Sequence, residues 1–416
     1  MARPPYDRPP VQRSPAALAR RRKVLRRRRI AAGVVLVLSM GAVAGGVASA
    51  LPGAAGGRRA GSRTVRSAAA RRSPQPWSVQ SWLTGLEARV KGQRGHLQPG
   101  SNPSALPGPI LIADRNASRL LIVDPKGRVL WQFPPPGSHI LFKEPDDAFF
   151  TPNGRDIIAT QESQATISEI SLRTDRIVWH YGHPGQPGSA PGYLHNPDDA
   201  MLLPNGNLLA ADIMNCRLLY ISTRTDSIVH IYGETTPYCY HAPPARFGSP
   251  NGMFPMTNGN WLVTEINGDW VDEMTPSGKI VWSTNPPGIS YPSDTNQVGP
   301  NRFLTASYTN PGVIEEFNRA GTLLWRFAPT GPAALNRPSL ALPLPNGDVI
   351  ANDDWNHRVI VIDPRTNRIV WQYGHTGVAG TAPGYLDKPD GVDLLPPYSL
   401  ATTHAATEGI PPFPGG

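Results

Sequence analysis

The stretch Pro197–Gly233, PDDAMLLPNGNLLAADIMNCRLLYISTRTDSIVHIYG, decides the fold. It predicts four short strands, at Asp199–Leu203, Asn207–Ala211, Arg217–Ser222 and Ser227–Tyr232. Asn205-Gly206 separates the first two strands, because both residues tolerate the positive φ of a tight hairpin turn. Four antiparallel strands in about 40 residues are typical of one blade of a β-propeller.

The same pattern recurs along the chain, in copies that start at Pro145, Pro250, Pro292 and Pro338. The last strand of each copy ends near an aromatic or histidine residue at one equivalent position: Trp131, Trp179, His230, Trp282, Trp325 and Trp371. Repeats of about 40–50 residues are the period of propeller blades. The chain therefore contains a repeated blade unit.

The first copy of the repeat is incomplete. GPILIADRNASRLLIVDPKGRVLWQF, from Gly108, has no first strand, whereas Pro389–Pro396 is a first strand with no blade after it. We expect the C-terminal strand to complete the N-terminal blade, because this pairing removes two free sheet edges. The sequence thus predicts an all-β fold, a closed six-bladed β-propeller of four-stranded antiparallel blades over residues 108–397.

Charge is divided unevenly along the chain. Residues 1–107 contain 20 Lys and Arg against 2 Asp and Glu, and the remaining residues contain 20 against 29, which together give the totals of 40 and 31. The basic character therefore belongs to the N-terminal segment, and the propeller is acidic. An acidic domain repels phosphate, so nucleic acid is excluded as a partner of the propeller.

The N-terminal segment indicates export. Residues 1–29 are Pro- and Arg-rich, and we expect a disordered cytoplasmic tail. Ile30–Leu51 carries no charge and is long enough to span a bilayer as a helix. The denser Arg before the span favours a single-pass signal-anchor with the propeller outside the cytoplasm. The alternative is secretion after cleavage near Ala50, because Ala48-Ser49-Ala50 resembles a signal-peptidase site.

Two segments flank the propeller. Residues 52–107 form a linker in which residues 77–90, WSVQSWLTGLEARV, predict a short amphipathic helix on the propeller, with an unstructured stalk as the alternative. Residues 398–416 form a Pro-rich tail.

The two cysteines, Cys216 and Cys239, lie in loops that open on the same rim of a propeller. Export favours a disulfide between them. The alternative is a pair of buried free thiols.

The L-P-N-G turns and N-x-R corners of Pro197–Leu218 and Pro338–Val359 resemble NHL repeats. The I-V-W-x-Y-G endings at Ile177–Gly182 and Ile369–Gly374 resemble the strand endings of quinoprotein-like and arylsulfotransferase-like propellers. The resemblance covers residues 108–397 and implies a fold rather than an activity. The quinoprotein enzymes usually have eight blades, so six blades argue against a quinone cofactor. An acidic rim is poorly suited to an anionic sulfuryl donor, which makes arylsulfotransferase activity the weaker expectation.

Carboxylates recur next to the proline that begins each first strand. The first strand of a blade is innermost, so we expect these side chains to ring the central channel. They are Asp146, Asp147, Asp198, Asp199, Asp294 and Asp390. Ca²⁺ prefers carboxylate and carbonyl oxygens, which makes the ring a candidate site for Ca²⁺ or another divalent cation. The alternative is that each Asp caps its own turn.

Side chains that break the repeat are candidates for specific chemistry, because a repeated residue has the same structural task in every blade. The pairs Asn215/Arg217 and Asn356/Arg358 are repeated, and we expect them to brace loops. His241 and His357 break the repeat and are catalytic candidates, and so are His183 and His375, which could also approach the rim. The ligand-binding candidates also break the repeat: Glu162, Trp270, Tyr308 and Trp355. His183 and His375 also lie in two similar Gly-rich inter-blade connections, where a structural role is the alternative.

Two functions follow as hypotheses. The first is a membrane-anchored, extracytoplasmic propeller that binds a small-molecule or protein ligand at its acidic rim. The second is an enzyme, a metal-assisted hydrolase or lyase with its site in the central channel and a histidine as base. Three or more carboxylates that converge on one point would favour a metal, and carboxylates turned into their own loops would favour the binding protein.

Overall fold

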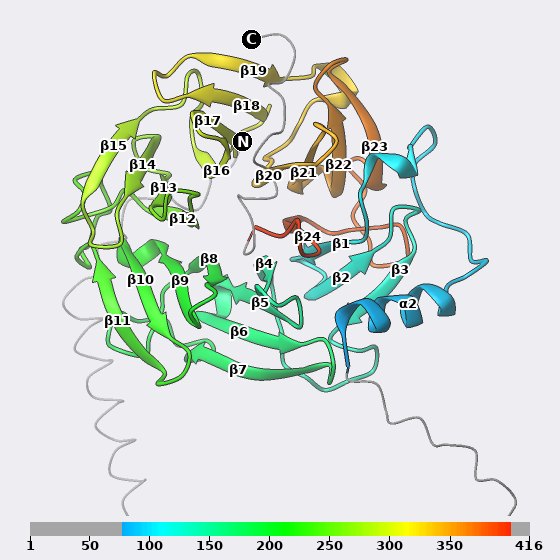
Figure 1. The fold of residues 1–416 in the computed structure, drawn as a ribbon, viewed down its shortest axis with the longest axis horizontal. Helices are drawn as coiled ribbons and strands as arrows, with labels where there is room; N and C mark the ends of the chain where they lie inside the picture. Colours follow the sequence, from blue (N-terminus) through cyan, green and yellow to red (C-terminus); the bar gives the residue numbers. More distant parts are fainter. Residues whose placement is uncertain (1–76, 401–416) are drawn as a thin grey trace, which may run out of the picture. The chain divides into compact units, whose positions relative to one another are not determined.

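The computed structural model describes residues 77–400, and within them six four-stranded antiparallel sheets form a ring (Figure 1). Blade 1 contains β24 (Pro389–Leu394), β1 (Ile110–Asp114), β2 (Arg119–Val123) and β3 (Val129–Phe133). Blade 2 contains β4 (Pro145–Phe150), β5 (Asp156–Gln161), β6 (Thr166–Ser171) and β7 (Arg176–Gly182). Blade 3 contains β8 (Pro197–Leu202), β9 (Asn207–Asp212), β10 (Arg217–Ser222) and β11 (Ser227–Tyr232).

The second half of the ring has the same order. Blade 4 contains β12 (Pro250–Pro255), β13 (Trp261–Glu265), β14 (Trp270–Met274) and β15 (Ile280–Thr284). Blade 5 contains β16 (Pro292–Gly299), β17 (Arg302–Ser307), β18 (Val313–Asn318) and β19 (Leu323–Phe327). Blade 6 contains β20 (Ala341–Pro343), β21 (Val349–Asp353), β22 (Arg358–Asp363) and β23 (Arg368–Gly374). The predicted six-bladed propeller is confirmed.

The ring closes through blade 1, as the incomplete first repeat predicts. β1 pairs with β24 in an antiparallel register that joins Ile110 to Leu394 and Ile112 to Val392. Those strands are buried, and Val392 packs in the same apolar cluster as Ile112 and Leu340 of blade 6. The closing strand therefore shares a core with both the first and the last blade.

Each outer strand is tied to the next blade by one polar contact. The indole Nε1 groups of Trp131, Trp179, Trp282, Trp325 and Trp371 donate hydrogen bonds to the turn between the third and fourth strands of the following blade. Blade 3 has His230 at the tryptophan position, and there the Tyr232 hydroxyl donates to the carbonyl of Pro276 in blade 4 at 2.7 Å. The repeated tryptophan is thus an inter-blade link.

Two N-terminal segments cover the outside of the ring. α2 (Val79–Arg89) begins at the N-cap Ser78, whose side chain accepts a hydrogen bond from the Ser81 backbone. The helix lies beside β3 (Figure 1), and Leu83 and Leu86 are buried in the blade 1 cluster. The helix predicted at residues 77–90 is therefore present. Residues 97–102 follow the edge of β23, where Gln98 and Asn102 donate backbone hydrogen bonds to Gln372 and Val370.

Short 3-10 helices form the corners and connections: η2 (Pro103–Ala105), η3 (Glu162–Gln164), η4 (Ile213–Asn215), η5 (Gly331–Ala333) and η6 (Asp354–Asn356). A residue with left-handed backbone closes η3, η4 and η6, namely Ala165, Cys216 and His357. Cys216 forms a disulfide with Cys239, with 5.1 Å between their Cα atoms. This bond joins the blade 3 corner to the connection that leads into blade 4.

The span expected at residues 30–51 lies outside the described residues, as do the tail 1–29, most of the linker and residues 401–416. Within residues 77–400, no helix is long and apolar enough to cross a membrane.

Candidate functional site

The axial carboxylates owe their position to irregular pairing at the start of the first strands. On β4, Pro145 pairs with Gln161 and Ala148 pairs with Ala159, so three steps along β4 lie opposite two steps along β5. β8 and β16 show the same shift against their neighbouring strands. Such a bulge re-aims the side chains next to it. The two residues after each rim proline therefore turn into the crowded axis, where Asp146 and Asp147 are each only 3% exposed.

Three of these carboxylates converge. Ligand oxygens of Asp147, Asp199 and Asp294 all lie within 4.8 Å of one another. Glycine at the equivalent position of two other blades makes room for them. A Cβ at Gly252 would lie 2.6 Å from Asp199 Oδ2 and 2.8 Å from Asp294 Oδ1, and one at Gly391 would lie 2.7 Å from Asp147 Oδ1. Side chains at those two positions would push the carboxylates apart.

The converging carboxylates have unused oxygens. Among the described residues, Asp147 Oδ1, both carboxylate oxygens of Asp199, and Asp294 Oδ2 accept no hydrogen bond although they are buried. A buried polar atom without a partner is costly, because it has lost its water. These side chains do not cap their own turns, which was the alternative that the sequence left open.

A second group shares Asp147 and includes Asp146 and Asp198, whose ligand oxygens also lie within 4.8 Å of one another. Arg115 lies beside it and donates to Asp146 Oδ1 and Asp390 Oδ2, each at 2.5 Å. Its other terminal nitrogen forms an ion pair with Glu162. One guanidinium thus partly neutralises Asp146, Asp390 and Glu162. It forms no ion pair with the converging Asp147, Asp199 and Asp294.

The pKa values reflect this crowding. Burial raises the pKa of Asp294 to about 6, and it raises that of Asp146 to about 7 in spite of Arg115. Burial and the repulsion of neighbouring carboxylates hold the pKa values of Asp147, Asp198 and Asp199 well above their usual range. The site favours either bound protons or a bound cation.

Two predicted ligand-binding residues lie together on the rim. Trp355 is 39% exposed, and its Nε1 donates to the Tyr308 hydroxyl at 3.2 Å. Lys388 Nζ lies 3.7 Å from the centre of the Trp355 indole, and the Arg337 guanidinium lies 4.5 Å from it. Glu162 is occupied by Arg115, and Trp270 lies elsewhere, against His241. The structure therefore brings together two of the four.

The histidine candidates have different surroundings. The His183 ring is tilted against Tyr193 with 4.1 Å between ring centres, and the His375 ring stacks on Tyr385 at 4.0 Å, each pair within its own Gly-rich connection. This repeated contact is a structural role. His357 Nδ1 accepts the backbone N–H of Lys388 at 3.1 Å, which holds the ring in the corner of blade 6.

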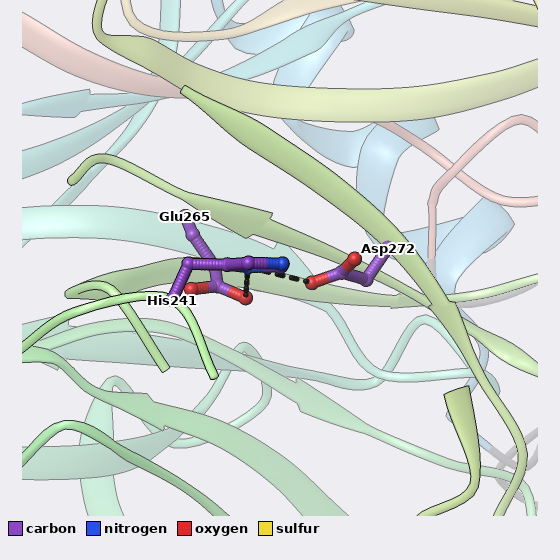
Figure 2. Close-up of side chains that lie close together, drawn as sticks. All are labelled: His241, Glu265 and Asp272. Carbon is purple, nitrogen blue, oxygen red and sulfur yellow. Dashed lines mark hydrogen bonds and ion pairs between the residues drawn. The ribbon is translucent and has the colours of Figure 1, made fainter. Parts of the chain in front are cut away.

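His241 is the histidine that faces buried acids (Figure 2). Its Nδ1 lies 3.0 Å from Glu265 Oε1 and 3.7 Å from Asp272 Oδ2. The ring stacks on Trp270 with 4.1 Å between centres and 10° between planes. Burial, together with a hydrogen bond that protonated Glu265 shares with Asp272 and the charge of Asp272, raises the pKa of Glu265 to about 10.

The same corner in other blades holds an ion pair. Asp212 Oδ2 accepts from Arg217 Nε at 2.7 Å and from Asn215 at 2.8 Å, and its Oδ1 accepts the His195 backbone N–H. Blade 6 repeats this arrangement with Asp353, Asn356 and Arg358, and blade 1 repeats the ion pair with Asp114 and Arg119. The expected bracing role of the N-x-R corners agrees with these contacts.

Asp272 and Arg115 were not singled out from the sequence. Asp272 occupies a strand position that holds Leu121, Leu219 and Ile360 in the blades with an Asp–Arg corner. A charge at an apolar repeat position was the available signal. Arg115 stands next to Asp114, at the position that is Asp354 in blade 6. A cation in an otherwise acidic ring could have been noticed in the same way.

Comparison with known proteins gives distant likenesses. No family model matches the chain, and no curated protein matches it. A solved protein of unknown function from Bacteroides caccae is 17% identical over 69% of this chain and 98% of its own, with a TM-score of 0.48. A streptogramin B lyase is 19% identical over 58% and 72%, with a TM-score of 0.41, and the WD40 propeller domain of Doa1 is 12% identical over 64% and 78%, with a TM-score of 0.42. The class of this protein is a six-bladed β-propeller, and these likenesses assign it no activity.

Proposed function

We propose that this chain is a membrane-tethered, extracytoplasmic propeller that binds a hard divalent cation on its axis and a ligand at the rim above it. The observation that carries the proposal is the convergence of Asp147, Asp199 and Asp294, with buried oxygens that accept no hydrogen bond from the described residues.

The geometry suits Ca²⁺. Calcium–oxygen distances of about 2.3–2.6 Å allow oxygens on opposite sides of one ion to lie roughly 5 Å apart. The oxygens of the three aspartates all lie within 4.8 Å of one another. Three carboxylates offer a trivalent negative site in the ionised state, which a divalent cation would largely neutralise. The donors are oxygens alone, which favours a hard cation over Zn²⁺ or Cu²⁺.

The rim supports ligand binding. The Trp355–Tyr308 pair forms an aromatic surface beside Arg337 and Lys388. Such a surface suits a ligand with a flat or apolar body and an oxygen or anionic group, since the cations next to the indole attract negative charge. This exposed surface is aromatic and cationic, whereas the axial carboxylates of the acidic rim that the sequence predicts are buried.

Two observations support the location outside the cytoplasm. The uncharged segment Ile30–Leu51 follows a basic tail, in the order of a signal-anchor. The Cys216–Cys239 disulfide suits an oxidising compartment. A reporter fused after Gly416 that is active only in the cytoplasm would contradict this topology.

Metal-assisted hydrolysis or elimination is the second candidate function. It rests on the same convergence, because three aspartates that each supply one oxygen leave further positions of a six- to eight-coordinate ion for a substrate. Turnover of a panel of ester and phosphoester substrates that a chelator abolishes and Ca²⁺ restores would favour the enzyme over the binding protein.

Calcium titration calorimetry tests the proposed function. The wild-type chain is expected to bind one Ca²⁺ on the axis, and Asp199→Asn is expected to weaken binding about tenfold or more, because it removes a charge and a ligand. Asp199 accepts no hydrogen bond from an N–H group or a hydroxyl group of the described residues. Glu87→Gln, on the exposed side of α2, is the charge control and should bind as the wild type does. Equal affinity in wild type and Asp199→Asn would refute the axial site.

A further inference from the structure

We infer that His241, Glu265 and Asp272 form a second metal site, for Zn²⁺ or a similar first-row divalent cation, at the corner of blade 4. The site uses none of the axial residues and does not depend on the proposed function.

The corner of blade 4 breaks the repeat. In blades 1, 3 and 6, the acid at the end of the second strand pairs with an arginine at the start of the third strand. In blade 4 the acid is Glu265, and the residue paired with it across the strands is Trp270. Asp272 adds another carboxylate at a position that is apolar in those blades. The corner has thus lost one positive charge and gained one negative charge.

No lysine or arginine of residues 77–400 forms an ion pair with either acid. Within residues 77–400, His241 is the one basic side chain within ion-pair distance of Glu265 or Asp272. Both carboxylates are 0% exposed. Two buried acids without a cation are costly, because burial removes the water that stabilises their charges. By contrast, Glu315 of blade 5, at the strand position of Asp272, pairs with Arg326.

The distances between the three candidate ligands suit a small divalent cation. Metal–ligand distances of about 2.0–2.2 Å place neighbouring ligands of a tetrahedral Zn²⁺ roughly 3.3–3.6 Å apart. The 3.0 Å and 3.7 Å from His241 Nδ1 to the two acids bracket that range. One imidazole and two carboxylates are a ligand set that zinc accepts, with the fourth position left for water or a ligand.

Each of the three side chains is held in place by a contact with a neighbouring residue. Glu265 Oε2 accepts the backbone N–H of Gly248, and Asp272 Oδ1 accepts the Ser283 hydroxyl. The other oxygen of each acid faces the His241 ring (Figure 2), and Asp272 Oδ2 accepts no hydrogen bond from the described residues. Stacking on Trp270 fixes the plane of the imidazole. Oriented ligands of this kind are what metal sites require.

The test is a Zn²⁺ titration of the full chain, stripped with chelator, in competition with a chromogenic chelator. Wild type is expected to bind one Zn²⁺ that His241→Ala loses. Glu265→Gln and Asp272→Asn should each weaken Zn²⁺ binding at least as much as the loss of a residue that only hydrogen-bonds to a metal ligand, which is roughly 10–100-fold. Co²⁺ in place of Zn²⁺ should give visible d–d absorption in wild type and none in His241→Ala.

Two controls separate this site from others. His375→Ala removes a histidine that stacks on Tyr385 in a similar way but whose Nδ1 contacts Gln98, so it should leave Zn²⁺ binding unchanged. Asp199→Asn should also leave it unchanged, whatever its effect on Ca²⁺. If His241→Ala does not fold, Glu265→Gln and Asp272→Asn, which conserve the shape of the side chain, test the site in its place. A wild-type chain that binds no Zn²⁺ at micromolar concentration, or binding that survives all three substitutions, would overturn the inference and leave a shared proton as the explanation of the cluster.

Discussion

Gly252 has to lack a side chain, since a Cβ there would lie 2.6 Å from Asp199 Oδ2 and 2.8 Å from Asp294 Oδ1. The axial site depends on this position as much as on its carboxylates. A repeat protein can thus build one specific site from nearly equivalent strands, by placing aspartate at this position in three blades and glycine in two others.

Affinity for Ca²⁺ is expected to rise with pH. The pKa of Asp294 is raised to about 6 and that of Asp146 to about 7 by burial, so both acids hold protons below these values in the metal-free protein. A cation must displace the protons of its ligands, and the pKa values of Asp147 and Asp199 are also raised well above the usual range. Binding is therefore weakest at acid pH and strengthens as pH increases through about 6, the pKa of Asp294, and above it. Titration calorimetry at pH 5, 6, 7 and 8 measures this, and affinity that stays constant over that series would contradict the assignment.

Single residues are also where sequence reasoning reached its limit. The ring of axial acids could be predicted from their place after each rim proline. Which three converge could not, because it depends on the bulges and on the space left by Gly252 and Gly391. The partnership of His241 with Asp272 depends on how an inter-blade connection folds back over its blade, which no local pattern encodes.

At the scale of elements, a hydrogen bond links each outer strand to the next blade. In blade 3, where His230 replaces the tryptophan, the Tyr232 hydroxyl takes over this contact with Pro276. The apolar face of each strand follows from the sequence. The residue that accepts the tryptophan's hydrogen bond cannot be predicted from the same local pattern, because it lies in the next blade.

Tyr232→Phe is therefore expected to destabilise the propeller by about 1 kcal/mol, since it removes one partly buried hydrogen bond and little else. Tyr238→Phe is the matched control, because Tyr238 is 72% exposed. Chemical denaturation of both variants measures the difference. Equal midpoints for the two would mean that the blade 3 link contributes nothing.

At the scale of the whole molecule, the repeat count predicted the topology because each blade carries its own turn and strand signals. Five complete copies, one without a first strand and one isolated strand leave a single way to pair every edge. The structure joins β1 to β24 in that way.

Deletion of everything after Lys388 is expected to lower the melting temperature of the entire domain, not of one strand. It removes β24, which pairs with β1 and packs against blade 6, and it exposes sheet edges. A chain that ends at Leu400 keeps β24 and serves as the control in scanning calorimetry. A chain cut after Lys388 that melted with the control would refute the role of closure in stability.

The axial cation is the central claim, and an anomalous difference map from crystals grown with Ca²⁺ tests it most directly. The predicted result is one peak on the propeller axis, about 2.3–2.6 Å from oxygens of Asp147, Asp199 and Asp294. A map with no axial peak at saturating Ca²⁺, and with the three carboxylates bonded to water or to their own loops, would contradict it.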